Sequence, residues 1–244
     1  MTGKPRVGLF VTCLVDLVRP QVGFAAVKLL EQAGCEVEVP VAQTCCGQPA
    51  WNAGADGHAV DIAKQVIAAF EGFDYVVVPS GSCGGMIKRH YAEVFEKDAA
   101  WLKRARALAA KTHELMSFLV KVRGMSGVTA QFAKTVCIHD SCSSLREMGV
   151  KAEPRALLGS VGGLAIDELK DQQTCCGFGG LFSIKHSQVS ERMADDKIAD
   201  AEATGARVLI GGDLGCLLHL EGRMRRRGKT MDVRHIAEVL AGEE

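Results

Sequence analysis

The tripeptide Cys-Cys-Gly occurs twice in the chain, and both copies follow Gln-Thr. Each copy belongs to a longer cysteine pattern, C-x31-C-C-x36-C in the first half and C-x32-C-C-x39-C in the second. Four thiolates are enough to hold one iron–sulfur cluster or one tetrahedral metal ion. The repeat therefore predicts two metal-binding sites, one formed by Cys13, Cys45, Cys46 and Cys83 and the other by Cys142, Cys175, Cys176 and Cys216.

Three kinds of chemistry fit these cysteines. Zinc accepts four thiolates, but structural zinc sites usually take C-x-x-C knuckles, and the sequence contains none. Adjacent cysteines suit an iron–sulfur core, whose several irons lie apart, better than a single small ion. Thiol–disulfide chemistry at the Cys-Cys pairs is the third interpretation, although a disulfide between neighbouring residues is strained. Iron–sulfur binding is favoured, and the other two interpretations stay open.

Two cysteines, Cys35 and Cys137, have no counterpart in the repeat. They lie at the entry to one expected strand and inside another. A free cysteine packs as a small hydrophobe, so we expect both of them in the core.

The elements that must position the cysteines alternate between strand and helix patterns. Such alternation predicts α/β architecture, with parallel sheets and helices on both of their faces. The cysteine repeat indicates two lobes related by internal duplication, residues 1–122 and 135–244, with a linker at 123–134. Strands are expected at 4–10, 36–41, 74–79, 135–139, 163–169 and 207–210, and helices at 20–33, 56–70 and 187–203.

All eight repeated cysteines fall in loops after expected strands or at the first turn of the following helix. In parallel sheets, functional groups gather beyond the carboxyl ends of the strands. Each lobe is therefore expected to bring its own four cysteines together at one sheet edge, beside helix N-termini that favour an anionic thiolate group.

Composition sets limits on function. The chain has 244 residues and equal numbers of acidic and basic residues, so no overall charge draws it to nucleic acid. No apolar run reaches the ~18 residues of a membrane span. The apolar stretch 7–15 is followed by Asp16 and Arg19, which favours a buried strand over a secretion signal. We therefore expect a cytoplasmic protein, in which thiols stay reduced and clustered cysteines favour metal or redox roles over disulfides.

The spacing of the eight cysteines resembles the cysteine-rich CCG domain. That domain occurs in the cysteine-rich subunit of heterodisulfide reductase, the glycolate oxidase iron–sulfur subunit and lactate utilization protein A. The flanking residues look like the lactate utilization protein A family in particular. They are His139-Asp140-Ser141-Cys142, Cys175-Cys176-Gly177-Phe178-Gly179-Gly180, Asp213-Leu214-Gly215-Cys216-Leu217-Leu218 and His235-Ile236-Ala237-Glu238-Val239-Leu240.

The resemblance implies two tandem Rossmann-like lobes that hold iron–sulfur clusters through the eight repeated cysteines. It implies a non-autonomous oxidoreductase subunit, which transfers electrons in a three-component system that oxidises L-lactate to pyruvate. The implied partners are a ferredoxin-type iron–sulfur subunit and a smaller third subunit. Two alternatives remain, a thiol/disulfide reductase of the heterodisulfide reductase type and a zinc-stabilised, non-redox interaction module.

The sequence departs from the fuller CCG motif at one position in each half. That motif ends in C-x-x-C, whereas Met86 and His219 stand at the last position here. Four cysteines per repeat favour a 4Fe-4S cluster in each lobe. His219 is either a ligand or a residue of an amphipathic helix, and we favour the helix. His139, Asp140 and Asp213 are expected to shape the cysteine loops and to hydrogen-bond toward cluster sulfurs.

Overall fold

The computed structural model describes residues 3–243 and contains two parallel four-stranded sheets. The first sheet has the order β2-β1-β3-β4 and the second has the matching order β6-β5-β7-β8. The predicted α/β duplication is confirmed by this repeated topology. The strands are β1 (Arg6–Leu9), β2 (Glu36–Glu38), β3 (Tyr75–Val78), β4 (Thr112–Glu114), β5 (Thr135–His139), β6 (Ala165–Ile166), β7 (Val208–Gly211) and β8 (Asp232–His235).

Helices connect the strands, and three of the connections contain short π-helical turns, η1 to η3. The first lobe contains α1 (Cys13–Val18), α2 (Gln21–Gln32), α3 (Gln48–Asn52), α4 (Asp56–Phe70), α5 (Gly81–Gly85), η1 (Met86–His90), α6 (Tyr91–Val94), α7 (Ala99–Ala110), α8 (Leu115–Ser117) and η2 (Phe118–Val122). The second contains η3 (Ser144–Met148), α9 (Ala152–Leu158), α10 (Phe182–Lys185), α11 (Ser187–Ala203), α12 (Leu214–Arg226) and α13 (Ile236–Ala241).

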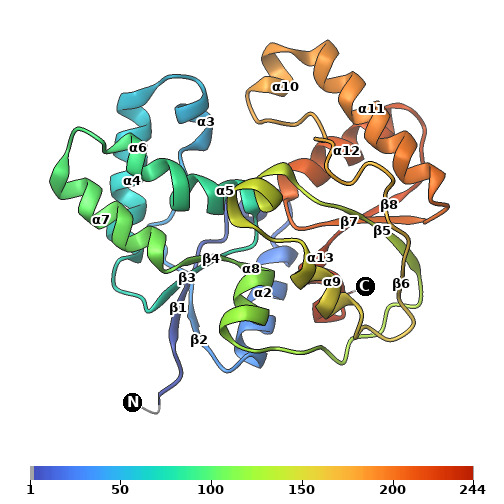
Figure 1. The fold of residues 1–244 in the computed structure, drawn as a ribbon, viewed down its shortest axis with the longest axis horizontal. Helices are drawn as coiled ribbons and strands as arrows, with labels where there is room; N and C mark the ends of the chain where they lie inside the picture. Colours follow the sequence, from blue (N-terminus) through green and yellow to red (C-terminus); the bar gives the residue numbers. More distant parts are fainter. Residues whose placement is uncertain (1–2, 244) are drawn as a thin grey trace.

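Alternate side chains of the central strands enter different cores, as the period of two in a strand requires. Val7 and Leu9 of β1 and Val136 and Ile138 of β5 share one core, which α2, α8, α9 and α13 fill between the sheets. Each lobe also has an outer core, under α4, η1 and α7 in the first and under α11 and α12 in the second (Figure 1). The shared core means that neither lobe buries its apolar surface alone.

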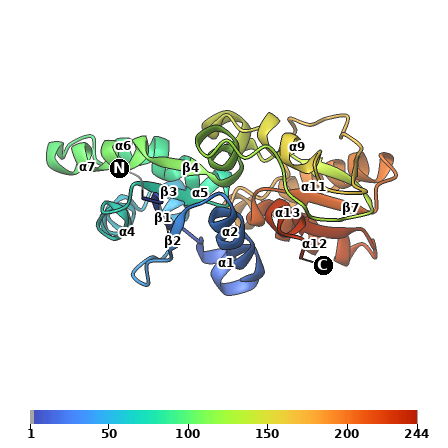
Figure 2. The same cartoon turned by 90° about the horizontal axis from the view of Figure 1, so that it is seen from below.

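Helices cross between the lobes in a reciprocal way. α1 of the first lobe packs on α12 of the second, and η3 of the second packs on α5 of the first. α2 and α13 lie side by side at the centre of the molecule (Figure 2). The approach at α5 is so close that a Cβ on Gly81 would lie 2.6 Å from the backbone nitrogen of Ser144. Glycine at this position therefore lets the lobes meet next to their cysteine loops.

The structure refines the predicted element boundaries. Helix α4, helix α11 and strand β5 end where the sequence predicts. Two edge strands are shorter than predicted. Strand β2 stops before Pro40, because proline has no N–H to donate, and β6 comprises only Ala165–Ile166. The separation into lobes at 123–134 stays a prediction. Within residues 3–243, no helix combines the length and the apolar character needed to span a membrane.

Candidate metal centres

The first set of cysteines converges at the carboxyl ends of β1 and β3. Cys13 begins α1, Cys83 lies in α5, and the Cys45-Cys46 pair lies in the loop between β2 and α3. All four cysteines line one cavity. Cys13 and Cys46 are close enough to Cys45 to shift its pKa, and Cys46 is likewise close to Cys83. The four sulfurs therefore form one connected group.

The second set repeats this arrangement. Cys142 lies just before η3, Cys216 lies in the first turn of α12, and Cys175 and Cys176 lie in the loop before α10. These four cysteines also line one cavity, and neighbours in the order Cys142, Cys175, Cys176, Cys216 are close enough to shift one another's pKa. The sequence of contacts along the chain is the same in both lobes, so the second set also forms one group.

Backbone N–H groups point at the loop sulfurs. Gly47 N donates to Cys45 Sγ at 3.4 Å, and Gly177 N donates to Cys175 Sγ at 3.3 Å. Both glycines have positive φ, 87° and 88°, which L-residues rarely adopt, so the chain can turn directly after each cysteine pair. At Gly177 a Cβ would also lie 2.6 Å from a backbone oxygen of α11. Glycine after each cysteine pair is thus a geometric requirement.

The packed thiols hold protons unevenly. Contacts with Cys13 and Cys46 lower the pKa of Cys45 below its usual value, while the contact with Cys45 and burial raise the pKa of Cys13 and Cys46. In the second lobe, the hydrogen bond to Cys175 and burial raise the pKa of Cys142. Adjacent sulfurs in a site of this kind do not all ionise unless a cation neutralises them.

The donor set fits an iron–sulfur centre in each lobe. Four convergent sulfurs, N–H groups directed at them and a largely buried setting are the features by which proteins hold and tune such clusters. Three of the eight cysteines are buried, namely Cys46, Cys176 and Cys216, and the other five are partly buried.

Both groups of cysteines face the interface between the lobes. A cavity of about 140 Å³ lies beside the first group, and one of about 210 Å³ lies beside the second. The first is lined in part by second-lobe residues and the second in part by first-lobe residues. Five residues line both cavities, so a thin shared wall separates the two groups: Gln48, Ser82, Phe178, Gly180 and Asp213.

Asp213 is the polar centre of this wall. It is only 3% exposed, and its side chain accepts hydrogen bonds from three groups. One oxygen accepts from Ser80 Oγ at 3.1 Å and from Ser82 N at 2.9 Å, both in the first lobe, while the other accepts from Gly215 N at 3.2 Å. Asp213 caps α12 and also accepts from a backbone N–H in the first turn of α5. Two helix N-termini therefore meet at this side chain, and both favour a negative charge.

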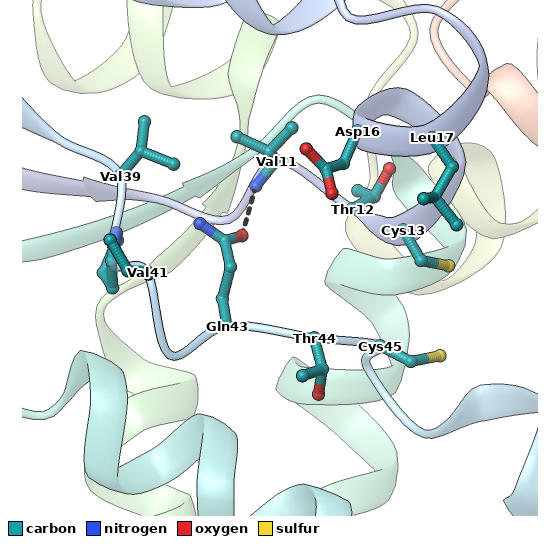
Figure 3. Close-up of a pocket in the computed structure, with 11 residues that line it drawn as sticks. Val11, Thr12, Cys13, Asp16, Leu17, Val39, Val41, Gln43, Thr44 and Cys45 are labelled. Atoms are coloured by element: carbon teal, nitrogen blue, oxygen red, sulfur yellow. Dashed lines mark hydrogen bonds between the residues drawn. The ribbon is translucent and has the colours of Figure 1, made fainter.

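A larger pocket, of about 520 Å³, opens on the outer side of the first group. Cys13 and Cys45 lie at one end of it with their sulfur atoms pointing the same way (Figure 3). Gln43 ties the loop to the end of β1, because its Oε1 accepts from Val11 N at 2.8 Å (Figure 3). Exposed apolar side chains line the rest of the pocket, namely Leu17, Val39 and Val41.

The histidines and Asp140 near the second group are placed differently from one another. His219 Nε2 lies 3.2 Å from Ser190 Oγ, and its ring lies beside that of Phe178. His139 lies next to the sulfurs: its ligand atoms and those of Cys176 and Cys216 are all within 4.8 Å of one another. Asp140 instead forms a two-pronged ion pair with Arg155. The sequence analysis singled out His139, but it did not note that the equivalent first-lobe residue is Phe10.

Residues outside the two groups also have definite places. Cys35 and Cys137 are buried in cores, which confirms their predicted role. Met86 is fully buried in the outer core of the first lobe. Glu114 and His235 are equivalent residues at the ends of β4 and β8, because the sheet registers pair Val78 with Glu114 and Gly211 with His235.

Two duplicated α/β lobes, each with four cysteines at its sheet edge, define a protein of the cysteine-rich class. The family model described as "Cysteine-rich domain" (CCG) matches residues 7–88 and 136–221, and the chain belongs to this family.

Within that class, the chain belongs to the lactate utilization protein A family. It is 48% identical over 236 residues to "Lactate utilization protein A 2" of Bacillus cereus (strain 03BB102), with 97% of this chain and 98% of the relative covered. It is also 48% identical over 235 residues to "Lactate utilization protein A" of Bacillus subtilis (strain 168), covering 96% and 98%.

A solved structure shows the same fold. A hypothetical protein from Helicobacter pylori matches with a TM-score of 0.70 at 12% sequence identity. The match covers 100% of this chain but only 52% of that one, so the chain spans about half the length of that protein.

Proposed function

We propose that this chain is an iron–sulfur electron-transfer subunit of a three-component system that oxidises L-lactate to pyruvate. In this proposal each lobe holds one cluster, of the 4Fe-4S type, through its four repeated cysteines. The names of the relatives support the link to lactate utilization. The chain would act as part of an oxidoreductase complex in the cytoplasm rather than alone.

One observation carries the proposal: two connected groups of four sulfurs face each other across a thin wall of protein. A pair of centres so placed suits passage of electrons through the chain better than two unrelated structural ions. The shared lining of the two cavities supports a short route between the lobes.

The chain's own residues would set the properties of the two centres. A bound iron–sulfur cluster supplies reversible one-electron transfer. Gly47 N and Gly177 N donate to ligand sulfurs, and such hydrogen bonds favour the more negative, reduced state. The buried positions of Cys46 and Cys176 exclude water from the inner side of each site. Asp213 fixes the distance between the two lobes by binding both α5 and α12.

The proposed partners are a ferredoxin-type iron–sulfur subunit and a smaller third subunit. The 520 Å³ pocket supports a place for the first of these, because it reaches Cys13 and Cys45 from outside and is bordered by exposed Leu17 and Val41. A partner cluster must approach a cluster edge closely to exchange electrons. The ferredoxin-type subunit would therefore cover this pocket and the apolar side chains around it.

The test is the iron, acid-labile sulfide and zinc content of the anaerobically purified chain, with absorption spectra before and after dithionite. The proposal expects a brown protein with about eight irons, bleached by the reductant. A correctly folded protein without iron or sulfide, even after cluster reconstitution, overturns it. Stoichiometric zinc in a colourless protein would instead support the zinc-stabilised interaction module.

A second candidate, a thiol/disulfide reductase, has one observation in its favour. Cys13 and Cys45 are partly exposed at the large pocket, where a disulfide substrate could reach them. This candidate expects reduction of small disulfides by the iron-free chain and loss of that activity after alkylation. The iron–sulfur proposal expects neither, so one assay with and without bound iron separates the two.

A further inference from the structure

His139 is the buried histidine with the least explained environment. It is the last residue of β5, it is 2% exposed, and neither ring nitrogen has a hydrogen-bond partner among residues 3–243. Leaving a buried polar group unpaired costs roughly 1–3 kcal/mol. The protein interior satisfies other buried histidines: His235, for example, accepts from Ala237 N and lies 3.2 Å from Pro79 O. Both nitrogens of the His139 ring are therefore free to bind a partner that the other buried histidines do not have.

The sulfurs of the second group lie beside this ring. A ligand atom of His139 and the sulfurs of Cys176 and Cys216 lie within 4.8 Å of one another. Donors that share one tetrahedral metal ion lie about 3.5 Å apart, given metal–nitrogen and metal–sulfur bonds of about 2.0–2.3 Å. The ligands of a cluster stand farther apart, because each binds its own iron. Small side-chain adjustments would bring these three atoms to either spacing.

The first lobe shows that the fold does not need a histidine here. Phe10 is the equivalent residue: it precedes Cys13 by as many residues as His139 precedes Cys142, and the two residues lie at the ends of the matched strands β1 and β5. Phe10 is fully buried, and its ring packs against Phe70 in the outer core. A hydrophobic ring thus fills this place in one lobe, whereas the other lobe has an imidazole with two unused nitrogens.

We propose that a ring nitrogen of His139 is a metal ligand of the second-lobe centre, together with Cys176 and Cys216. The two centres then differ in donor set: the first is held by thiolates alone, and the second by thiolates and an imidazole. This inference rests on the proposed metal binding by the cysteines. Because each iron of a four-iron cluster takes one protein ligand, the imidazole would replace one of the four cysteines of this lobe.

Pulsed electron paramagnetic resonance of the reduced, iron-loaded chain tests the inference, because a nitrogen bonded to the centre gives a strong ¹⁴N coupling. We expect this coupling in the unchanged chain and its loss in His139→Phe, which copies the first lobe. The matched control is His219→Phe, since His219 is also near the second group but is bound to Ser190. That variant should keep the coupling.

Two further variants protect the test against a folding failure. His139→Cys keeps a donor atom at the site, so we expect it to retain iron while the ¹⁴N coupling disappears. Phe10→His places an imidazole beside the first group and should create a second nitrogen-coupled signal. Strong coupling that survives in His139→Phe, or that is absent from an unchanged chain with both clusters present, overturns the inference.

A cobalt titration separates this inference from the proposed function. If the unchanged chain binds no iron, the iron–sulfur proposal fails, and Co²⁺ added to the metal-free protein then reports the donors directly. We expect the visible ligand-field bands of the Co²⁺-loaded chain to shift in His139→Phe and to stay in place in His219→Phe. Identical Co²⁺ spectra for all three proteins would show that His139 is not a ligand.

Discussion

The two lobes share their backbone plan but differ in the side chains around their cysteines. Sheet order, the chain of sulfur contacts and the positive-φ glycines Gly47 and Gly177 are the same in both. Two of the differences lie beside the sulfurs: Phe10 is equivalent to His139, and Ser80 is equivalent to Asp213. Duplication thus kept what holds a centre, while the residues that would tune it diverged.

The differences also divide the work between the lobes. The first lobe has the open pocket with exposed Leu17 and Val41, so its centre is the more accessible one. The second lobe supplies Asp213 to the interface and places His139 beside Cys176. The first lobe is thus arranged for contact with a partner protein, whereas the second lobe has a buried histidine beside its cysteines.

The largest expected effect comes from removing one ligand in each lobe. Cys45→Ser and Cys175→Ser should each lose about half of the iron, because each group of four sulfurs is complete within its own lobe. Iron analysis and electron paramagnetic resonance of the reduced proteins measure the loss. Cys35→Ala is the control, since Cys35 is buried in the shared core away from both groups. Loss of both centres from a single substitution would contradict independent sites.

The second-largest effect concerns Asp213 and its first-lobe equivalent Ser80, which lie at the interface between the lobes. Asp213→Ala leaves three donors, including Ser82 N and Gly215 N, without their acceptor and should reduce the free energy of unfolding by about 3 kcal/mol. Ser80→Ala removes only one of these bonds and should cost about 1 kcal/mol. Urea unfolding of both variants measures the difference, with Asp213→Asn expected between them. Equal losses for Asp213→Ala and Ser80→Ala would remove the asymmetry proposed here.

The sequence predicted the repeated fold and each group of cysteines, because both depend on local patterns. Period-two and helical spacings fix strands and helices, and loops after parallel strands necessarily meet at one sheet edge. The positions of α4 and α11 follow directly from such patterns. The short edge strands were less predictable, since β6 has a neighbour on one side only and its length depends on tertiary contacts.

The interface between the lobes was not predictable in the same way. The sequence suggested that each site lies at its own sheet edge, and nothing in the spacing indicates that both sites share a wall. That arrangement comes from the shared core and from crossed contacts such as α1 on α12, which are set by packing between distant segments. A single signal was available in the sequence: Asp213 stands before α12 where the first lobe has Ser80 before α5.

A third prediction uses the equivalent strand-end residues Glu114 and His235, which respond to pH in opposite directions. Burial raises the pKa of Glu114 from 4.5 to about 7, so its contribution to stability is present below pH 4.5 and is lost as the pH rises through 7. Burial lowers the pKa of His235 from 6.5 to about 4, so its contribution is complete above pH 6.5 and is lost as the pH falls toward 4.

Substitution of each residue should flatten one side of the stability profile. Glu114→Gln removes the ionisation and should raise the free energy of unfolding by about 1–3 kcal/mol above pH 7, with little gain near pH 5. His235→Gln loses the hydrogen bond from Ala237 N at every pH, but its stability should fall less than that of the unchanged chain on acidification. Urea unfolding from about pH 5 to 8 gives both profiles. Profiles parallel to that of the unchanged chain would exclude these two groups as the cause.

The smallest effect concerns the side-chain hydrogen bond that holds each cysteine loop in place. In the first lobe Tyr91 Oη donates to the carbonyl of Cys46 at 2.9 Å, and in the second Ser190 Oγ donates to the carbonyl of Gly177 at 2.7 Å. Neither bond has a counterpart in the other lobe among the described residues. The second-lobe equivalent of Tyr91 is Met224, since each lies eight residues after its cysteine. The first-lobe residue nearest to Gly47 in the position of Ser190 is Ala59, which has no hydroxyl.

Tyr91→Phe and Ser190→Ala should therefore each cost about 1 kcal/mol of unfolding free energy and perturb the electron paramagnetic resonance signal of their own lobe alone. The double variant shows whether the two loops are stabilised independently or are coupled through the shared core. Loops that are tied independently give additive losses, since the two bonds lie in different lobes and share no partner. A double loss that departs from the sum, or a signal change in the opposite lobe, would mean that the shared core transmits strain between the centres. The lobes would then be tuned as one unit, and their divergent side chains would have to be read as a single set.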